Sequence, residues 1–248
     1  MKVGLFGIGY WGRRIYSSLT QRTDIEDVVV VDSRGDPNLI LEDDQIENVF
    51  IATPVNTHYA LCMSAIRAGK NVMCEKNLAP TIQTSEDIVS EASLYDRSLL
   101  VDFIYAFNPE LPLLGLGEHD RLTVTMHQHG RFRDEDVMSI LGSHALAVAN
   151  EVVGLHRAEN IWSYEVSPSY PRRSVVAGFA LDSGAILIVD VSVDASEKVR
   201  TIQTRDITWQ LDYDNGIDLM IEKFLSGEDN SVEALLVAEC LEQTRMLC

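Results

Sequence analysis

The feature that most constrains the fold is a glycine-rich segment close to the start of the sequence. Residues 7–12 read Gly-Ile-Gly-Tyr-Trp-Gly, and they lie between a strand-like apolar stretch, Val3–Gly7, and a helical pattern, Gly12–Leu19. A second apolar run, Val28–Val31, ends at Asp32, which stands 20 residues after the last glycine of the segment. Glycines at this spacing between a strand and a helix, followed by an acidic residue, are typical of a dinucleotide-binding βαβ unit.

Each glycine has a separate task in such a unit. Gly7 permits the tight turn, Gly9 lets the backbone approach a pyrophosphate, and Gly12 lets the helix pack closely on the strand. The helix N-terminus offers free N–H groups to the phosphates. Asp32 can accept hydrogen bonds from ribose hydroxyls and would repel a 2′-phosphate, which favours NAD, while the nearby Arg34 keeps NADP possible. The alternative is a glycine-rich turn that binds nothing.

The first hundred residues alternate between strand and helix patterns, which predicts a parallel sheet with right-handed crossovers. Further strands are expected at Val49–Ala52, Asn71–Glu75 and Leu99–Phe103, helices at Thr57–Ala68 and Thr84–Tyr95, and a helix-like piece at Leu41–Asn48.

After Pro109 the pattern changes, so we expect two domains, residues 1–109 and 110–248. Leu111–Glu118 is expected to be a crossing segment, and Asp182-Ser183-Gly184 a hairpin turn. The remaining strands are expected at Arg121–His129, Asn160–Glu165, Ser174–Leu181, Ala185–Val193, Val199–Thr204 and Ile207–Leu211, and helices at Met138–Val153, Ile217–Leu225 and Val232–Leu247. The fold class is therefore α/β, a parallel Rossmann sheet with helices followed by an α+β domain with a largely antiparallel sheet.

Charge and cysteine content limit the partners. The 248 residues include 20 basic and 38 acidic ones, a net charge of −18, which disfavours nucleic acid and anionic membranes as partners. No apolar run approaches the ~20 residues of a membrane helix. The four cysteines, Cys62, Cys74, Cys240 and Cys248, are scattered without metal-ligand spacing. We therefore expect a reduced, cytoplasmic protein without a metal site.

Two more segments carry polar side chains where predicted strands end. Residues 52–58 read Ala-Thr-Pro-Val-Asn-Thr-His, and either Asn56 or Thr57 could cap the helix that follows. Residues 74–77 read Cys-Glu-Lys-Asn. Lys76 could donate or accept a proton there if burial lowered its pKa, although an acid next to a base is more often a surface pair.

The order of these motifs resembles the glucose–fructose oxidoreductase, inositol dehydrogenase and MocA (Gfo/Idh/MocA) family. The resemblance covers residues 1–109 well and continues more loosely through Phe107–Pro109, through the Leu-Gly-Ser-His run 141–144 and through Ile217–Leu247. It implies a Rossmann domain and an α/β domain whose open sheet faces the substrate and supports a homodimer or homotetramer. It also implies hydride transfer between a nicotinamide and a hydroxyl or carbonyl carbon of a sugar, cyclitol or similar polyol.

The resemblance also assigns roles. Lys76 would be the catalytic acid or base, His144 would bind the substrate hydroxyl, and Glu75 would bind the nicotinamide ribose. His144 could also be an ordinary core residue. The candidate cofactor contacts are Gly7, Ile8, Gly9, Tyr10, Trp11, Gly12, Asp32, Ser33, Arg34, Thr53, Pro54, His58 and Glu75. Further candidates for the substrate face are His127, His129, Tyr164, Arg172 and Arg173.

The sequence departs from the family pattern at several positions. Asn77 replaces the usual proline after the Glu-Lys pair, Ile140 replaces an aspartate four residues before the histidine, and Ala106 replaces an arginine. Residues 134–136, Asp-Glu-Asp, lie upstream of Ile140 with no settled helical phase toward His144. The short link from Asp32 to Val49 suggests a trimmed, short family member. Two alternatives follow, a cofactor-binding protein with little activity and a non-redox enzyme that uses bound NAD.

Overall fold

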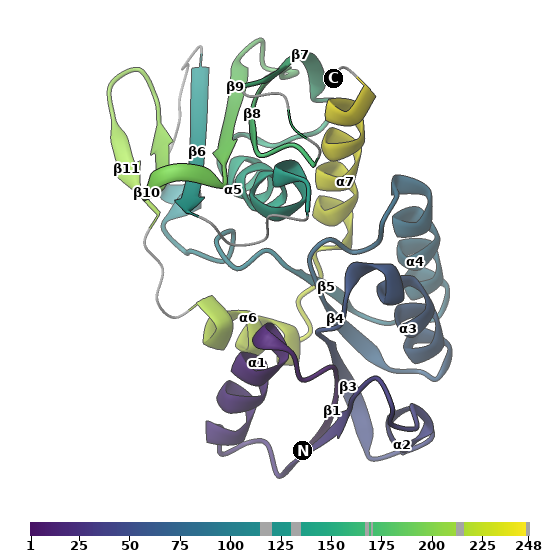
Figure 1. Cartoon of the computed structure of the whole chain (residues 1–248). Coiled ribbons are helices and arrows are strands. Elements are labelled where there is room, and N and C mark those ends of the chain that lie inside the picture. Colours follow the sequence, from purple (N-terminus) through teal and green to yellow (C-terminus); the bar gives the residue numbers. More distant parts are fainter. Residues whose placement is uncertain (115–120, 130–134, 167–168, 170, 212–215, 247–248) are drawn as a thin grey trace. The chain divides into compact units, whose positions relative to one another are not determined.

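The structure is a computed structural model that describes residues 1–114, 121–129, 135–166, 169, 171–211 and 216–246. The chain forms two compact units (Figure 1). The first consists of Met1–Asp102 and Asn215–Leu235, and the second of Phe103–Asp214 and Leu236–Cys248. The first unit thus includes a segment from the C-terminal part of the sequence. These compact units do not test the domain boundary that we expect after residue 109, which stays a prediction.

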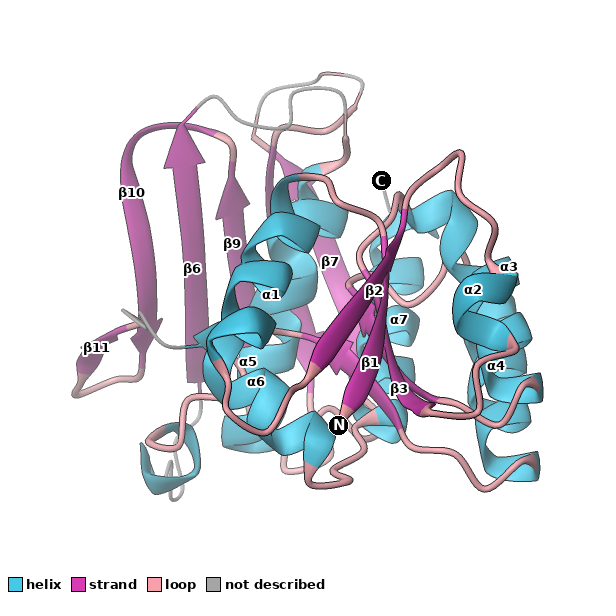
Figure 2. Ribbon diagram, turned by 90° about the horizontal axis from the view of Figure 1, so that it is seen from below, coloured by secondary structure: helices cyan, strands magenta, loops and turns pink. Residues whose placement is uncertain are grey.

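The first unit is built on a five-stranded sheet in which all strands are parallel. Its strands, in the order β2-β1-β3-β4-β5, are β1 (Lys2–Phe6), β2 (Asp27–Val31), β3 (Ile46–Ile51), β4 (Asn71–Glu75) and β5 (Leu99–Asp102). The helices of this unit are α1 (Tyr10–Gln21), α2 (Asn38–Leu41), α3 (Val55–Arg67), α4 (Ile82–Leu94) and α6 (Gly216–Leu225). Helices α1 and α6 cover one face and α3 and α4 the other, as Figures 1 and 2 show. This confirms the predicted Rossmann sheet.

The strand order places a topological switch point at β1 and β3. From β1 the chain crosses to β2 on one side, then returns past β1 to β3 and continues to β4 and β5. In open parallel sheets, ligands bind outside the carboxyl ends of the strands at such a reversal. The segments after Phe6 and Ile51 therefore form the expected ligand edge.

The interior of the connection between β2 and β3 differs from the prediction. The expected helix at Leu41–Asn48 is wrong, because α2 covers only Asn38–Leu41 and β3 already begins at Ile46. Ile46 is buried and pairs with Lys2 in the sheet, so its side chain belongs to the core. Sheet pairing overrides the local helical preference here.

Strand β5 lies at the edge of the sheet, and the turn before helix α7 (Ser231–Met246) covers it. The Asp229 carboxylate accepts a hydrogen bond from the Leu99 N–H at 2.7 Å. The Asn230 carboxamide accepts from the Val101 N–H at 2.6 Å and donates to the Val101 carbonyl at 3.0 Å. These side chains occupy strand hydrogen-bonding groups that an edge would otherwise leave exposed.

The second unit is built on a six-stranded sheet that is antiparallel except for the β6–β9 pair. Its strands, in the order β11-β10-β6-β9-β8-β7, are β6 (Arg121–His129), β7 (Glu159–Glu165), β8 (Ser174–Ala180), β9 (Ile186–Ser192), β10 (Asp194–Gln203) and β11 (Thr208–Gln210). Helix α5 (Ser143–Val153) packs on one face, which contains the buried Leu122, Val124 and Met126 of β6. The predicted α+β architecture is confirmed.

The helix predicted at Met138–Val153 has two parts. Residues Met138–Gly142 form a π-helical turn, and the α-helix begins at Ser143. Single π turns inside helices are frequent at functional sites, and this one directly precedes His144. The Leu111–Glu118 segment is a 3₁₀ turn over Leu111–Leu114, and its remainder lies outside the described residues, as do Asp134 and Cys248. None of the described helices is both long and apolar enough to cross a membrane.

Candidate functional site

The glycine-rich turn after β1 has the geometry that each glycine was predicted to supply. Gly7 has a φ of +91°, and a Cβ there would lie 2.5 Å from the Ala52 carbonyl oxygen. A Cβ on Gly12 would lie 2.2 Å from the Gly7 carbonyl oxygen. A Cβ on Gly9 would have no protein atom within 4 Å. Gly7 and Gly12 are therefore required by close backbone contacts, whereas Gly9 leaves open space beside the backbone, where a dinucleotide pyrophosphate fits.

Helix α1 begins directly at this opening. Its N-cap residue is Gly9, which has no side chain that could accept a hydrogen bond from the N–H groups of the first turn. Tyr10 is exposed and contacts Trp11 edge-on, and the Arg14 guanidinium lies 4.8 Å from the Trp11 ring centroid. The Ile8 carbonyl accepts a hydrogen bond from Arg13 Nε at 3.1 Å. The N-terminus of α1 thus presents backbone donors to an anion.

Asp32 follows the last residue of β2 and is exposed. Its carboxylate accepts the Arg34 N–H at 2.9 Å, which folds residues 32–34 into a turn that includes the exposed Ser33. The other carboxylate oxygen has no hydrogen-bond partner among the described residues, so a ribose hydroxyl could bind there.

The segment after β3 differs from its prediction in two respects. Pro54 is the N-cap of α3, so neither Asn56 nor Thr57 caps this helix, and Thr57 Oγ1 instead lies 2.7 Å from Thr53 Oγ1. His58 is 1% exposed, and its ring nitrogens lie 2.8 Å from the carbonyl oxygens of Thr53 and Asn77. Burial lowers the pKa of His58, although both carbonyl contacts oppose that effect. Both ring nitrogens are thus engaged by backbone, so His58 positions these two loops instead of touching a cofactor.

The carboxyl end of β4 contains a buried pair of acids. Glu75 is adjacent to Asp102 of β5 in the ladder, with exposures of 7% and 2%. Burial, followed by the charge of Asp102 and a hydrogen bond to it, raises the pKa of Glu75 well above its ordinary value, while the charge of Lys76 acts in the opposite direction. Glu75 Oε1 is buried without a hydrogen-bond partner among the described residues. An unpaired buried oxygen at the ligand edge fits the predicted contact of Glu75 with a ribose hydroxyl.

Lys76 follows directly after β4 and is half-buried. The positive charge of Lys76 acts to lower the pKa of both Glu75 and His58. The peptide bond between Lys76 and Asn77 is cis, at the position where the family pattern has proline. The ends of β1, β3 and β4 thus bring together most of the predicted cofactor residues and Lys76 within the first unit.

His144 lies in the second unit, in the first turn of α5, and is 8% exposed. The Tyr105 ring contacts it edge-on, with 5.3 Å between the ring centroids. The Tyr105 ring also contacts Arg200, whose guanidinium carbon lies 5.7 Å from the ring centroid. His144 is therefore part of a polar cluster with Tyr105 and Arg200, instead of being an isolated histidine in an apolar core.

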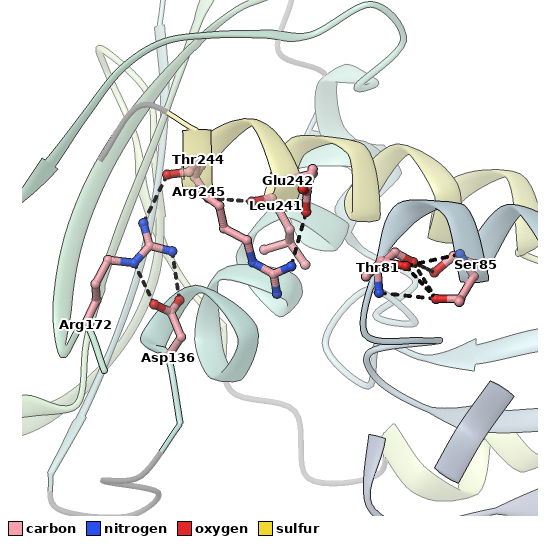
Figure 3. A network of polar contacts seen from close by, with 9 residues as sticks. Thr81, Ser85, Asp136, Arg172, Leu241, Glu242, Thr244 and Arg245 are labelled. Atoms are coloured by element: carbon pink, nitrogen blue, oxygen red, sulfur yellow. Dashed lines mark hydrogen bonds and ion pairs between the residues drawn. The ribbon is translucent and has the colours of Figure 1, made fainter. Parts of the chain in front are cut away.

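The acids upstream of His144 do not replace the aspartate that Ile140 has lost. Ile140 is buried, and Asp136 accepts hydrogen bonds from Arg172 Nε and Nη2 at 2.6 and 3.0 Å. Arg172 also donates to the Thr244 carbonyl at 3.0 Å, so the pair ties the start of the π turn to α7 (Figure 3). Glu135 is exposed. Arg172 and Asp136 thus have a structural role.

The structure does not bring the other substrate-face candidates together with His144. Arg173 is paired with Asp194, and the exposed His129 contacts the Ala195 carbonyl at 3.2 Å. His127 and Tyr164 alternate with the buried strand residues that face α5, so they lie on the opposite face of the sheet. His127 Nε2 is 2.9 Å from an Asp190 carboxylate oxygen on that face.

Three residues of the two clusters were not predicted. Asp102 was part of an apolar strand pattern, and only the β4–β5 register reveals that it pairs with Glu75. Tyr105 and Arg200 belong to a turn and to a distant strand, and nothing in their local sequence links them to His144. A possible signal for Asp102 was a charged residue inside an otherwise apolar run.

Known proteins with similar sequences and structures agree with this geometry. Residues 32–103 match the family described as "Oxidoreductase family, NAD-binding Rossmann fold". This segment thus resembles the NAD-binding part of the Gfo/Idh/MocA family. Inositol 2-dehydrogenase of Rhodococcus jostii is 29% identical in an alignment 129 residues long, which covers 44% of this chain and 35% of that enzyme. The chain thus spans about a third of the length of such curated relatives.

Solved structures with low sequence identity share the fold along the whole chain. UDP-N-acetylglucosamine 3-dehydrogenase from Acidithiobacillus ferrooxidans superposes with a TM-score of 0.86 at 18% identity, over 100% of this chain and 97% of that one. A variant of a 3-ketoreductase from Actinomadura kijaniata, solved with TDP-benzene and NADP, gives 0.80 at 16% identity, over 100% and 97%. Residues 32–103 therefore match the NAD-binding Rossmann fold of this family. The fold of the second unit is also present in these solved structures.

Proposed function

We propose that the protein is an NAD(P)-dependent oxidoreductase that acts on a hydroxyl or carbonyl carbon of a sugar-, cyclitol- or polyol-like molecule. The observation that carries this proposal is the opening at Gly9, where a Cβ would meet no protein atom, at the switch point of the parallel sheet. The activities of proteins with similar sequences, such as inositol 2-dehydrogenase, support the substrate class. NAD is the expected cofactor, and NADP is the alternative.

The residues of the first unit have defined tasks in this proposal. The backbone around Gly9 and the N-terminus of α1 would hold the pyrophosphate, Asp32 the adenosine ribose and Glu75 the nicotinamide ribose. The nicotinamide, when bound, supplies the hydride acceptor or donor. Lys76 would take the hydroxyl proton from the substrate or return it, and His144 would bind a substrate hydroxyl. His58 would hold the Thr53 and Asn77 loops in place.

A second candidate is a cofactor-binding protein with little or no turnover. The buried Ile140 favours it, because an apolar side chain stands where the family pattern has an acid and because Asp136 is engaged by Arg172. A non-redox enzyme that uses bound NAD is a further alternative, and the same experiment tests it. These alternatives predict nucleotide binding without net formation of NADH.

The test is to titrate the purified protein with NADH and NADPH by fluorescence, then to mix it with NAD⁺ or NADP⁺ and a set of sugars and cyclitols. The proposal predicts saturable binding and an increase in reduced-nucleotide absorbance with at least one member of the set. Binding without any such increase would favour the second candidate. Absence of nucleotide binding would contradict both.

The proposal extends to assembly and location. Trp162 and Tyr164 are exposed on the face of the second sheet opposite α5, which supports a homodimer or homotetramer through that face. Light scattering of wild type and Tyr164→Glu tests this assembly, which a wild-type monomer would contradict. The charge of −18 supports a protein with neither nucleic acid nor membrane as a partner. The scattered cysteines support the reduced, cytoplasmic location that we propose.

A further inference from the structure

We propose that Arg200 binds an anionic group of the substrate, so that the substrate class is a sugar or cyclitol carrying a carboxylate or a phosphate. The inference rests on the proposed oxidoreductase function and deepens it, because it names the kind of molecule that the second unit takes. It follows from the hydrogen bonds of one guanidinium and from a comparison with two others in the same unit.

The charge of Arg200 has no anionic partner among the residues that the structure describes. Arg200 is 5% exposed, and its Nη1 donates to the backbone carbonyls of Val199, at 2.8 Å, and His127. Its Nη2 donates to Gln128 Oε1 at 3.2 Å. All of these acceptors are neutral. A guanidinium cannot lose its proton in a protein, and a buried charge without an opposite charge is costly, so an anion from outside the described residues is expected.

Two other arginines of the same unit show what the edge of a guanidinium formed by Nε and Nη2 binds in this protein. Arg172 directs its Nε and Nη2 at the two carboxylate oxygens of Asp136, at 2.6 and 3.0 Å (Figure 3). Arg173 directs the same two nitrogens at the carboxylate of Asp194. In Arg200, Nε is buried without a partner among the described residues, and Nη2 has only a neutral oxygen. This edge matches a carboxylate or phosphate in a two-point contact.

The surroundings of Arg200 connect it to the proposed substrate site. Arg200 pairs with Met126 in the ladder, whose buried side chain lies on the α5 face of the sheet. Tyr105 contacts both Arg200 and His144 through its ring. Gln128 Nε2 is a second buried donor without a partner among the described residues. The unpaired donors therefore lie on the same side of the sheet as the histidine proposed to bind the substrate hydroxyl.

The first arm of the test compares neutral and anionic forms of one ring. Glucose, glucuronate and glucose 6-phosphate form one set, galactose and galacturonate a second, and myo-inositol and its monophosphate a third. Calorimetry with saturating NAD⁺ should show that an anionic member binds about 10–100-fold more tightly than its neutral counterpart, since hydrogen bonds to charged groups are the strong ones. Comparing carboxylate with phosphate members distinguishes the two anions. Arg200→Gln should abolish the difference, and Arg173→Gln should leave it unchanged.

The second arm tests whether the charge has a partner inside the chain. Arg172→Met should lower the melting temperature, because it leaves Asp136 without its cation. Arg200→Met should leave the melting temperature of the free protein unchanged or raise it, because it removes an uncompensated charge. The inference is overturned if Arg200→Met is as destabilising as Arg172→Met, if no anionic member of any set binds more tightly than its neutral counterpart, or if the preference survives Arg200→Gln.

Failure of this inference can be told apart from failure of the proposed function. A wild-type protein that reduces NAD⁺ with neutral polyols and shows no preference for anions would refute the role of Arg200 and leave the oxidoreductase standing. A wild-type protein that prefers anionic sugars without binding or reducing a nicotinamide nucleotide would do the reverse.

Discussion

Glu75 and Asp102 are adjacent across the β4–β5 ladder at the carboxyl edge of the first sheet, and both are buried. Two carboxyl groups in such an environment cannot both ionise without cost, so the pKa of Glu75 is raised well above its ordinary value, first by burial and then by Asp102. The folded protein thus retains a proton on this pair at a pH where the unfolded chain has lost it.

The pair therefore predicts a stability that falls as the pH rises. Because the pKa of Glu75 is higher in the folded than in the unfolded state, its contribution is lost as the pH rises from the ordinary glutamate value toward the folded one. Asp102→Asn should reduce this loss, by about 1.4 kcal/mol for each pKa unit that it removes. Thermal unfolding from about pH 5 to pH 9 measures it. An equally steep loss in the variant would contradict the coupling of the two acids.

The glycines of the nucleotide loop should separate folding from binding. Gly9→Ala should unfold at the wild-type temperature, because Gly9 has a φ of −68° and its Cβ meets no protein atom, yet it should weaken NADH binding about tenfold or more by filling the opening. Gly7→Ala should lose about 2 kcal/mol of unfolding free energy, because of its positive φ and the Ala52 carbonyl. Calorimetry and fluorescence titration measure both. Unchanged NADH binding in Gly9→Ala would remove the pyrophosphate from this position.

Asp32 should decide between the two nucleotides. Asp32→Ala should weaken NAD⁺ binding by about tenfold and reduce the discrimination against NADP⁺, since it removes both the ribose acceptor and the charge that repels a 2′-phosphate. Asp36→Ala is the matched control, because Asp36 makes the same kind of turn bond, to the Asn38 N–H at 3.0 Å. Dissociation constants for both nucleotides test the prediction, which fails if the two variants behave alike.

His58 should matter through the loops that it connects. His58→Ala removes the ring whose nitrogens lie 2.8 Å from the Thr53 and Asn77 carbonyl oxygens, and should cost about 1–3 kcal/mol of unfolding free energy. Since burial lowers the pKa of His58, wild-type stability should fall as the pH drops below the ordinary histidine value of about 6.5, and less so in the variant. Denaturant unfolding at several pH values measures both effects. His156→Ala, at an exposed histidine, serves as control.

Much of the fold followed from the sequence, because buried parallel strands and glycine spacing are local signals. The strand at Arg121–His129 and the helices near Ile217–Leu225 and Val232–Leu247 agree with β6, α6 and α7 to within one or two residues. The helix-like piece at Leu41–Asn48 failed because the partner strand of Ile46 lies far away in sequence.

The cofactor side of the site was predictable for the same reason, whereas the substrate side was not. Gly7, Gly9, Gly12 and Asp32 sit where their spacing placed them. The environment of His144 depends on Tyr105 and Arg200, which the β6–β10 pairing and a turn bring to it from 39 and 56 residues away in sequence. The burial of His58 likewise depends on a loop after another strand.

The most direct test of the central claim is hydride transfer by a Lys76 variant. Lys76→Met should bind NADH with the wild-type dissociation constant but form NADH from NAD⁺ and the best alcohol of the set about 100-fold more slowly or worse, because no group moves the hydroxyl proton. Lys198→Met, at an exposed lysine, should match wild type. If Lys76→Met turns over at the wild-type rate, Lys76 is not the acid or base and the account is wrong.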